Sequence, residues 1–187
     1  MKITDTFEVS SDIEKVWAAF ANVPDLAHCL PGAELTEDHG DGRYSGTVEA
    51  KLGPITASFD GEATVVLDEI RHTGTMTGKG VDRRGGSRAQ LELIYALDTV
   101  AAGTRVTINA DVLLSGAAAQ FGRIGLLQEM TGRIINEFVH CLEAKLSAPS
   151  AESAAAIHAP EVRGLSLFFA SVFAPITRLF KRIFRRS

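Results

Sequence analysis

The sequence contains few of the residues from which metal sites and catalytic sites are built. Among 187 residues there are two cysteines, one tryptophan and five histidines. Two cysteines without a C-x-x-C motif are too few for a disulfide-rich scaffold or a zinc site. No Ser/His/Asp set can be assembled, and the sequence has neither a G-x-G-x-x-G motif after a strand nor a P-loop. We therefore expect no metal site, no catalytic residues and no nucleotide binding.

The neighbouring His28 and Cys29 could together supply a thiol nucleophile or a metal ligand. Adjacent side chains point in different directions, however, and cysteine is among the most frequently buried residue types. A buried Cys29 beside a surface His28 is the simpler prediction.

A long apolar segment is also missing. Residues Met1–Ser10 alternate polar and apolar side chains, so we expect no cleaved signal peptide and a cytoplasmic protein. The uncharged run Gly164–Thr177 has fourteen residues. A transmembrane helix needs about 20.

Charge is divided unevenly along the chain. Six basic residues and no acidic ones follow position 162, so the overall net charge of −4 leaves −10 on residues 1–162. An acidic body with a basic tail predicts two parts with different partners. The acidic body also argues against nucleic acid as a ligand.

Periodicity in the body indicates strands followed by a long helix. Two-residue alternation predicts strands, and a three-to-four-residue apolar period predicts helices. The expected strands are 2–9, 43–52, 55–67, 73–80, 89–97 and 104–114, and the expected helices are 13–22, 25–29 and 118–146.

This order of elements predicts an α+β fold. Long antiparallel strands with one apolar face need a cover, and the helix at 118–146 would be about 40 Å long, enough to cross the sheet. Glycines on the facing surfaces remove bulk, so the sheet and the helix could enclose an apolar cavity; these are Gly46, Gly61, Gly122, Gly125 and Gly132.

The C-terminal region separates into a linker and a tail. Residues 148–163 are rich in Ala, Ser and Pro and are typical of a flexible linker. Residues 164–187 contain five of the ten phenylalanines. On a helix, one face would carry Phe168, Phe169, Phe173, Leu179, Phe180 and Phe184, and the other Arg178, Lys181, Arg182, Arg185 and Arg186. We interpret this tail as an amphipathic helix that lies on an anionic membrane surface; the alternatives are packing on the body or on a partner, and insertion across the membrane.

A second basic segment lies at an expected hairpin tip. Residues 78–88 carry four cations among several glycines. This tip could bind an acidic partner surface or a lipid headgroup, or it could be an ordinary solvated loop.

Several short motifs resemble a known family. They are Cys29-Leu30-Pro31-Gly32-Ala33, Lys51-Leu52-Gly53-Pro54, Phe59-Asp60-Gly61 and Gly85-Gly86-Ser87. In this order they resemble the carbon monoxide dehydrogenase G-subunit family of the START-like (SRPBCC) superfamily, over residues 1–147. The resemblance implies a helix-grip fold, in which a seven-stranded curved antiparallel sheet surrounds a long C-terminal helix and an apolar pocket. It also implies an accessory role beside a molybdenum hydroxylase such as aerobic carbon monoxide dehydrogenase, at the cytoplasmic membrane, with no catalytic residue set.

Together these features lead to a functional hypothesis. A lipophilic pocket and a membrane-binding tail suit a non-enzymatic carrier that recruits the enzyme to the membrane. It would deliver a quinone, menaquinone or ubiquinone, as electron acceptor. The expected cavity residues are Trp17, Phe20, Leu30, Phe59, Phe121, Leu127, Met130 and Ile134.

Two alternatives belong to other functional classes. A purely structural adaptor would recruit the enzyme without binding a ligand. A START-like cyclase or hydrolase would need polar groups in the pocket, and the strand faces offer few beyond Tyr44 and Tyr95.

Overall fold

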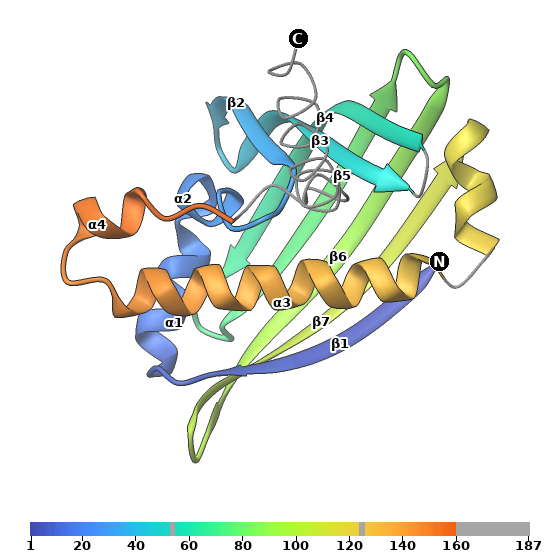
Figure 1. The fold of residues 1–187 in the computed structure, drawn as a ribbon. Coiled ribbons are helices and arrows are strands. Elements are labelled where there is room, and N and C mark those ends of the chain that lie inside the picture. The colour runs from blue at the N-terminus through green and yellow to red at the C-terminus, as the bar shows by residue number, and fades with distance from the viewer. Residues whose placement is uncertain (53–54, 124–125, 160–187) are drawn as a thin grey trace, which may run out of the picture.

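The computed structural model describes residues 1–52, 55–123 and 126–159. Seven strands form one antiparallel sheet with the order β1-β7-β6-β5-β4-β3-β2 (Figure 1). The strands are β1 (Lys2–Val9), β2 (Ala33–Gly40), β3 (Arg43–Leu52), β4 (Ile55–Asp68), β5 (Thr73–Asp82), β6 (Ser87–Val100) and β7 (Gly103–Ser115). The helices are α1 (Ile13–Ala21), α2 (Val23–Ala27), the 3-10 helix η1 (Gly116–Arg123), α3 (Leu126–Ser147) and α4 (Ala151–Ala155).

The curved sheet wraps around α3, which crosses its concave face (Figure 1). This confirms the predicted α+β architecture of an antiparallel sheet with a C-terminal helix. Two details differ from the sequence prediction. The helix expected over 118–146 is divided into η1 and α3, and β2 is an additional strand. β2 is an edge strand with two register irregularities and an almost wholly polar second half, so it lacks regular alternation.

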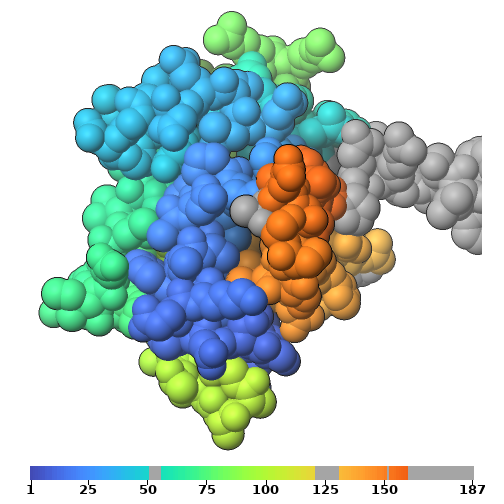
Figure 2. Space-filling view, turned by 90° about the vertical axis from the view of Figure 1, so that its left-hand side faces the viewer, coloured from blue at the N-terminus to red at the C-terminus, as the bar shows by residue number. Residues whose placement is uncertain are grey.

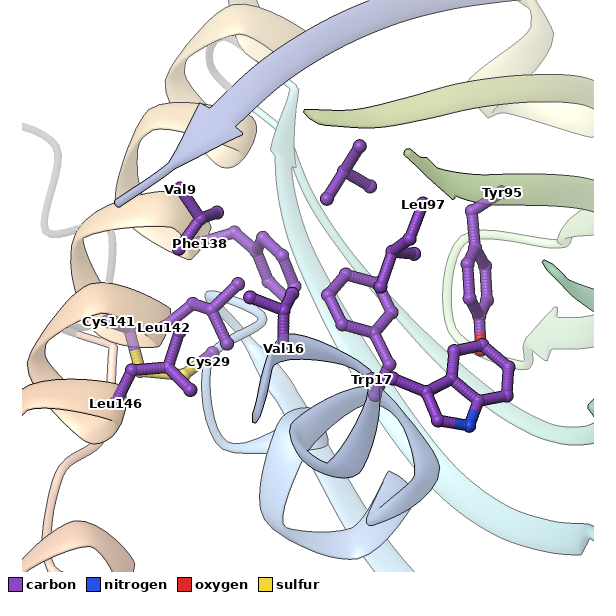
Figure 3. Packing of buried hydrophobic residues seen from close by; sticks show 12 residues of the cluster. Val9, Val16, Trp17, Cys29, Tyr95, Leu97, Phe138, Cys141, Leu142 and Leu146 are labelled. Atoms are coloured by element: carbon purple, nitrogen blue, oxygen red, sulfur yellow. A yellow bond between two sulfur atoms is a disulfide. The ribbon is translucent and has the colours of Figure 1, made fainter. Parts of the chain in front are cut away.

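The main core lies between α1, the C-terminal half of α3 and one end of the sheet. Val16, Trp17 and Phe20 of α1 pack there with Phe138 and Leu142 of α3 (Figure 3). The spacing of these residues places them on one side of each helix, as an amphipathic pattern requires. The Phe20 ring contacts the rings of Tyr95 and Phe138, with centroid distances of 5.0 and 6.1 Å.

A disulfide joins Cys29, just after α2, to Cys141 in α3, with their Cα atoms 5.4 Å apart (Figure 3). Cys29 is buried and the His28 side chain is 44% exposed, as predicted, but the thiol is not free. The sequence does not predict this bond because 112 residues separate the two cysteines and neither lies in a pairing motif. In the chain-entropy account, a loop of that length stabilises the fold by about 4–5 kcal/mol.

The first part of the expected linker is ordered against the body. Ser150 caps α4 by accepting a hydrogen bond from the Ser153 amide. Further along, the Ala159 amide donates to the His28 carbonyl at 2.8 Å, and Ile157 packs against the main core. The Ala-, Ser- and Pro-rich segment expected to be a linker therefore contains a helix cap and is held on the body up to residue 159.

Within the part of the chain that the structure describes, no helix is long and apolar enough to cross a membrane. The predicted tail helix, residues 164–187, lies outside the described residues.

Candidate functional site

The concave face of the sheet has a strip without large side chains. Four small residues are paired in one row across the sheet: Gly46 with Gly61, Gly61 with Gly80, and Gly80 with Ala89. A Cβ added to Gly61 would lie 2.4 Å from the Lys79 carbonyl oxygen, so the close approach of β4 and β5 also requires glycine there. In this strip the strands are closely packed, and the face that points toward α3 carries no large side chains.

One end of this concave face is filled by the main core and the other is only partly covered. At the filled end Leu97 is 3% exposed and Val106 is fully buried. Beyond it, on the same face, Leu91 and Leu93 are half-buried, and Val48 is 48% exposed although it pairs with the buried Phe59.

The cover is incomplete because the two halves of α3 are packed differently. Phe138 and Leu142 in its C-terminal half are buried against the main core. Toward the N-terminal half, Ile134, which lies on the same side of the helix as Phe138, is 37% exposed. Among the described side chains, the apolar surface between the sheet and this half of the helix is therefore only partly covered.

The filled end is closed by elements far apart in the sequence. Figure 2 shows the N-terminal segment, in blue, directly beside the C-terminal helices, in orange. The buried Lys145 ammonium donates to the Asp25 carboxylate at 2.7 Å and to the Ala154 carbonyl at 2.9 Å, which ties α3 to α2 and α4. With the disulfide, these bonds leave the opposite end of the concave face as the accessible one.

The structure distributes the predicted cavity residues over several places. Trp17 and Phe20 are together in the main core, whereas Phe59 belongs to a second, smaller cluster with Ala57 and Ala118. Leu30, on the loop after α2, and Ile134, on α3, are each 37% exposed. Phe121 belongs to η1, and Leu127 and Met130 to α3; their side chains lie outside the described residues. The described side chains of the set are therefore divided between two clusters and two exposed positions, and the role of the set as a cavity wall stays a prediction.

Sequence reasoning missed part of this face. The sequence pattern places Gly78 and Gly80 both at the end of the expected strand 73–80 and in the expected hairpin tip 78–88; they belong to β5, and the turn itself starts only after Asp82. Leu91 and Leu93 of β6 share their face, paired across from Gly78 and Met76. The alternation of β6 predicts that Leu91 and Leu93 lie on its apolar face. The glycine-rich end of β5 has no apolar alternation, so its pattern gives no such prediction.

Two tyrosines add polar groups to the concave face. Burial raises the pKa of Tyr95 to about 12, so its hydroxyl is neutral at physiological pH. Burial and the nearby Asp38 carboxylate raise the pKa of Tyr44 above its usual value. Among the described residues, no three His, Cys, Asp or Glu side chains are grouped so that they could hold a metal ion. The described side chains of this face are mostly apolar; Tyr44 and Tyr95 add hydroxyl groups, and Asp5 of β1 and Asp82 at the end of β5 add carboxylates.

The model of one protein family matches residues 6–147 of the chain; the family is that of the carbon monoxide dehydrogenase G subunit, CoxG. No curated protein shows significant sequence similarity to the chain.

Solved structures share the fold at low sequence identity. A conserved protein from Geobacillus kaustophilus has a TM-score of 0.67 and 16% identity, over 79% of this chain and 95% of its own. The ZhuI aromatase/cyclase from Streptomyces sp. R1128 has a TM-score of 0.55 and 16% identity, over 79% of this chain and 96% of its own. Protein Ms6760 from Mycobacterium smegmatis has a TM-score of 0.55 and 17% identity, over 80% and 92%. These similarities establish the START-like fold.

Proposed function

Because the chain belongs to the CoxG family of carbon monoxide dehydrogenase G subunits, we propose that it is a non-enzymatic accessory protein of a molybdenum-containing hydroxylase. It recruits this enzyme to the cytoplasmic face of the membrane and carries a quinone to it as electron acceptor. The observation that supports a carrier, rather than a structural adaptor, is the partly open apolar face between the sheet and α3.

A quinone needs such a face because its isoprenoid chain is insoluble in water. Each CH₂ group removed from water contributes about 0.8 kcal/mol. The half-buried Leu91 and Leu93 and the exposed Val48 offer apolar surface, and the row from Gly46 to Ala89 leaves space above it. Neutral hydroxyls at Tyr44 and Tyr95 suit the carbonyl oxygens of a quinone head.

Membrane location is supported by the composition of residues 164–187. Five phenylalanines and five cations in the last twenty residues have the composition of an interfacial helix that binds anionic lipids. The hydrogen bond from Ala159 to His28 holds the last described residue of the chain on the body, five residues before the predicted tail. A carrier attached in this way stays beside the bilayer in which the quinone is dissolved.

The carrier function is tested by extracting the full-length protein, purified with the lipids of a respiring host, and identifying bound quinone by ultraviolet and mass spectra. We expect a stoichiometric quinone. Gly78→Leu would place a large side chain in the space above the concave face; its Cβ would be in ordinary van der Waals contact with neighbours at 3.7 and 3.8 Å, and the rest of the side chain would occupy the space proposed for the quinone. If this overpacking reduces the binding free energy by about 1–3 kcal/mol, the affinity for the quinone falls about five- to 150-fold.

The matched control is Thr77→Leu, which adds a leucine to the opposite, exposed face of the same strand. It should retain the quinone of the wild type. An empty wild-type protein from quinone-rich lipids would favour the structural adaptor. Because an aromatase/cyclase shares the fold, a turnover that depends on Tyr95 would instead favour an enzyme.

A further inference from the structure

Three exposed arginines at the β5–β6 turn have no partner within the described part of the chain. They are Arg83, Arg84 and Arg88. Three other exposed cations of the body are paired: Lys79 with Glu62 at 3.2 Å, Arg71 with Asp68 at 3.3 Å, and Arg105 with Glu8 at 2.9 Å. We call residues 83–88 the arginine turn; it concentrates unpaired positive charge on a body that is otherwise acidic.

The arginine turn has a defined conformation. The buried Asp82 carboxylate accepts hydrogen bonds from the backbone amides of Arg84 and Gly85, at 3.0 and 2.8 Å. Gly86 follows with φ +65°, a conformation that favours glycine. These bonds restrict the turn, so fewer conformations are lost when a ligand binds.

A second contact fixes the turn beside the partly open end of the concave face. The buried Ser87 hydroxyl accepts a hydrogen bond from the Ala118 amide of η1 at 3.0 Å. Ala118 in turn packs with Ala57 and Phe59 on the concave face. Figure 1 shows the β5–β6 turn beside η1, at the end of the sheet away from α1 and α4.

We propose that the arginine turn binds anionic lipid headgroups and directs the partly open end of the concave face toward the bilayer. This inference rests on the proposed membrane location. Guanidinium groups bind phosphate oxygens through two parallel hydrogen bonds, and they attract an anionic leaflet that repels the acidic remainder of the body. The membrane is favoured over an acidic protein because a lipophilic ligand has to enter the concave face from the bilayer.

The test compares two full-length variants that each lose three positive charges. Arg83→Gln, Arg84→Gln and Arg88→Gln remove the arginine turn; Arg43→Gln, Arg71→Gln and Arg105→Gln are the matched control. Binding is measured on phosphatidylcholine vesicles with and without phosphatidylglycerol, at about 0.1 M salt. A basic residue near an anionic surface contributes about fivefold to binding. We expect the turn variant to bind the anionic vesicles at least tenfold more weakly than the control.

A second measurement is independent of the affinity that the tail supplies. Both native cysteines are in the disulfide, so a fluorophore can be attached selectively to a new cysteine at the exposed Gln90 or Thr6. Quencher-labelled headgroups should quench the label at Gln90, near the arginine turn, more than the label at Thr6. Replacing the three arginines should remove this difference.

The outcomes separate this proposal from the proposed function. If the wild type fails to bind anionic vesicles, the membrane location itself is wrong. If it binds, but the turn variant matches the control in both affinity and quenching, only the role of the arginine turn is wrong. Unchanged vesicle binding with loss of co-purification with the hydroxylase would overturn the lipid assignment in favour of a protein contact.

Discussion

Gly74 and Gly78 lie on the same face of β5 but differ in what surrounds them. A Cβ added to Gly74 would lie 2.1 Å from the Tyr95 ring, whereas one added to Gly78 would have no atom closer than 3.7 Å. Glycine at 74 is therefore required by the position of a buried aromatic ring, and glycine at 78 is not required by any neighbour. The difference separates a packing glycine from one that leaves space on the concave face.

We predict that Gly74→Ala destabilises the protein and that Gly78→Ala does not. Inserting a methyl group against the Tyr95 ring should cost about 1–3 kcal/mol. Gly78→Ala should stay within about 0.5 kcal/mol of the wild type or stabilise it, since alanine reduces the freedom of the unfolded chain. Urea denaturation of the oxidised proteins measures both. Equal stability of the two variants would contradict the close packing of Tyr95 on Gly74.

Lys145 connects three helices through one buried ammonium group. Its partners are the Asp25 carboxylate and the Ala154 carbonyl, so α2 and α4 are both attached to α3 at this point. Removing either partner leaves the other charge uncompensated. The cost is larger when the remaining charge is the Lys145 ammonium, whose side chain is 4% exposed, than when it is the Asp25 carboxylate, which is 28% exposed and can be hydrated.

We predict that Asp25→Asn costs more stability than Lys145→Met. Because Asp25 is partly exposed, we expect about 2–3 kcal/mol for Asp25→Asn, near or below the range for fully buried pairs. Lys145→Met should cost less than about 1.5 kcal/mol but release α4, so limited proteolysis should cleave within residues 148–159 faster than in the wild type. Protection of that segment in the methionine variant would show that Lys145 does not hold it.

Individual elements differ in how well the sequence predicts them. The alternation in 55–67 and 104–114 is sufficient for β4 and β7, because each strand has one apolar face and one polar face. The sequence does not predict β2 because Glu37, Asp38 and His39 give an edge strand a polar pattern. Apolar side chains that fill a core and those that line a site have the same periodicity, so the pattern alone does not separate the two roles for Trp17 and Phe20, which lie in the main core.

At the level of the whole molecule, the two ends of the concave face differ in how they are closed. The disulfide and the Lys145–Asp25 ion pair close one end, and the arginine turn stands beside the other. A carrier needs this asymmetry because a ligand must enter and leave while the fold persists. A structural adaptor needs only the tail and a surface for the enzyme, and the packing of the concave face would be irrelevant to it.

This difference gives the last prediction. The chain ending at Pro160 should detach from anionic vesicles, and attaching an unrelated membrane anchor should restore both binding and hydroxylase-dependent reduction of membrane quinone. The same anchored chain with Gly78→Leu should bind vesicles equally well but support little quinone reduction, because its concave face is filled. Thr77→Leu in that background should remain active. If Gly78→Leu supports full reduction, recruitment alone explains the function, and the partly open face between the sheet and α3 has no part in electron delivery.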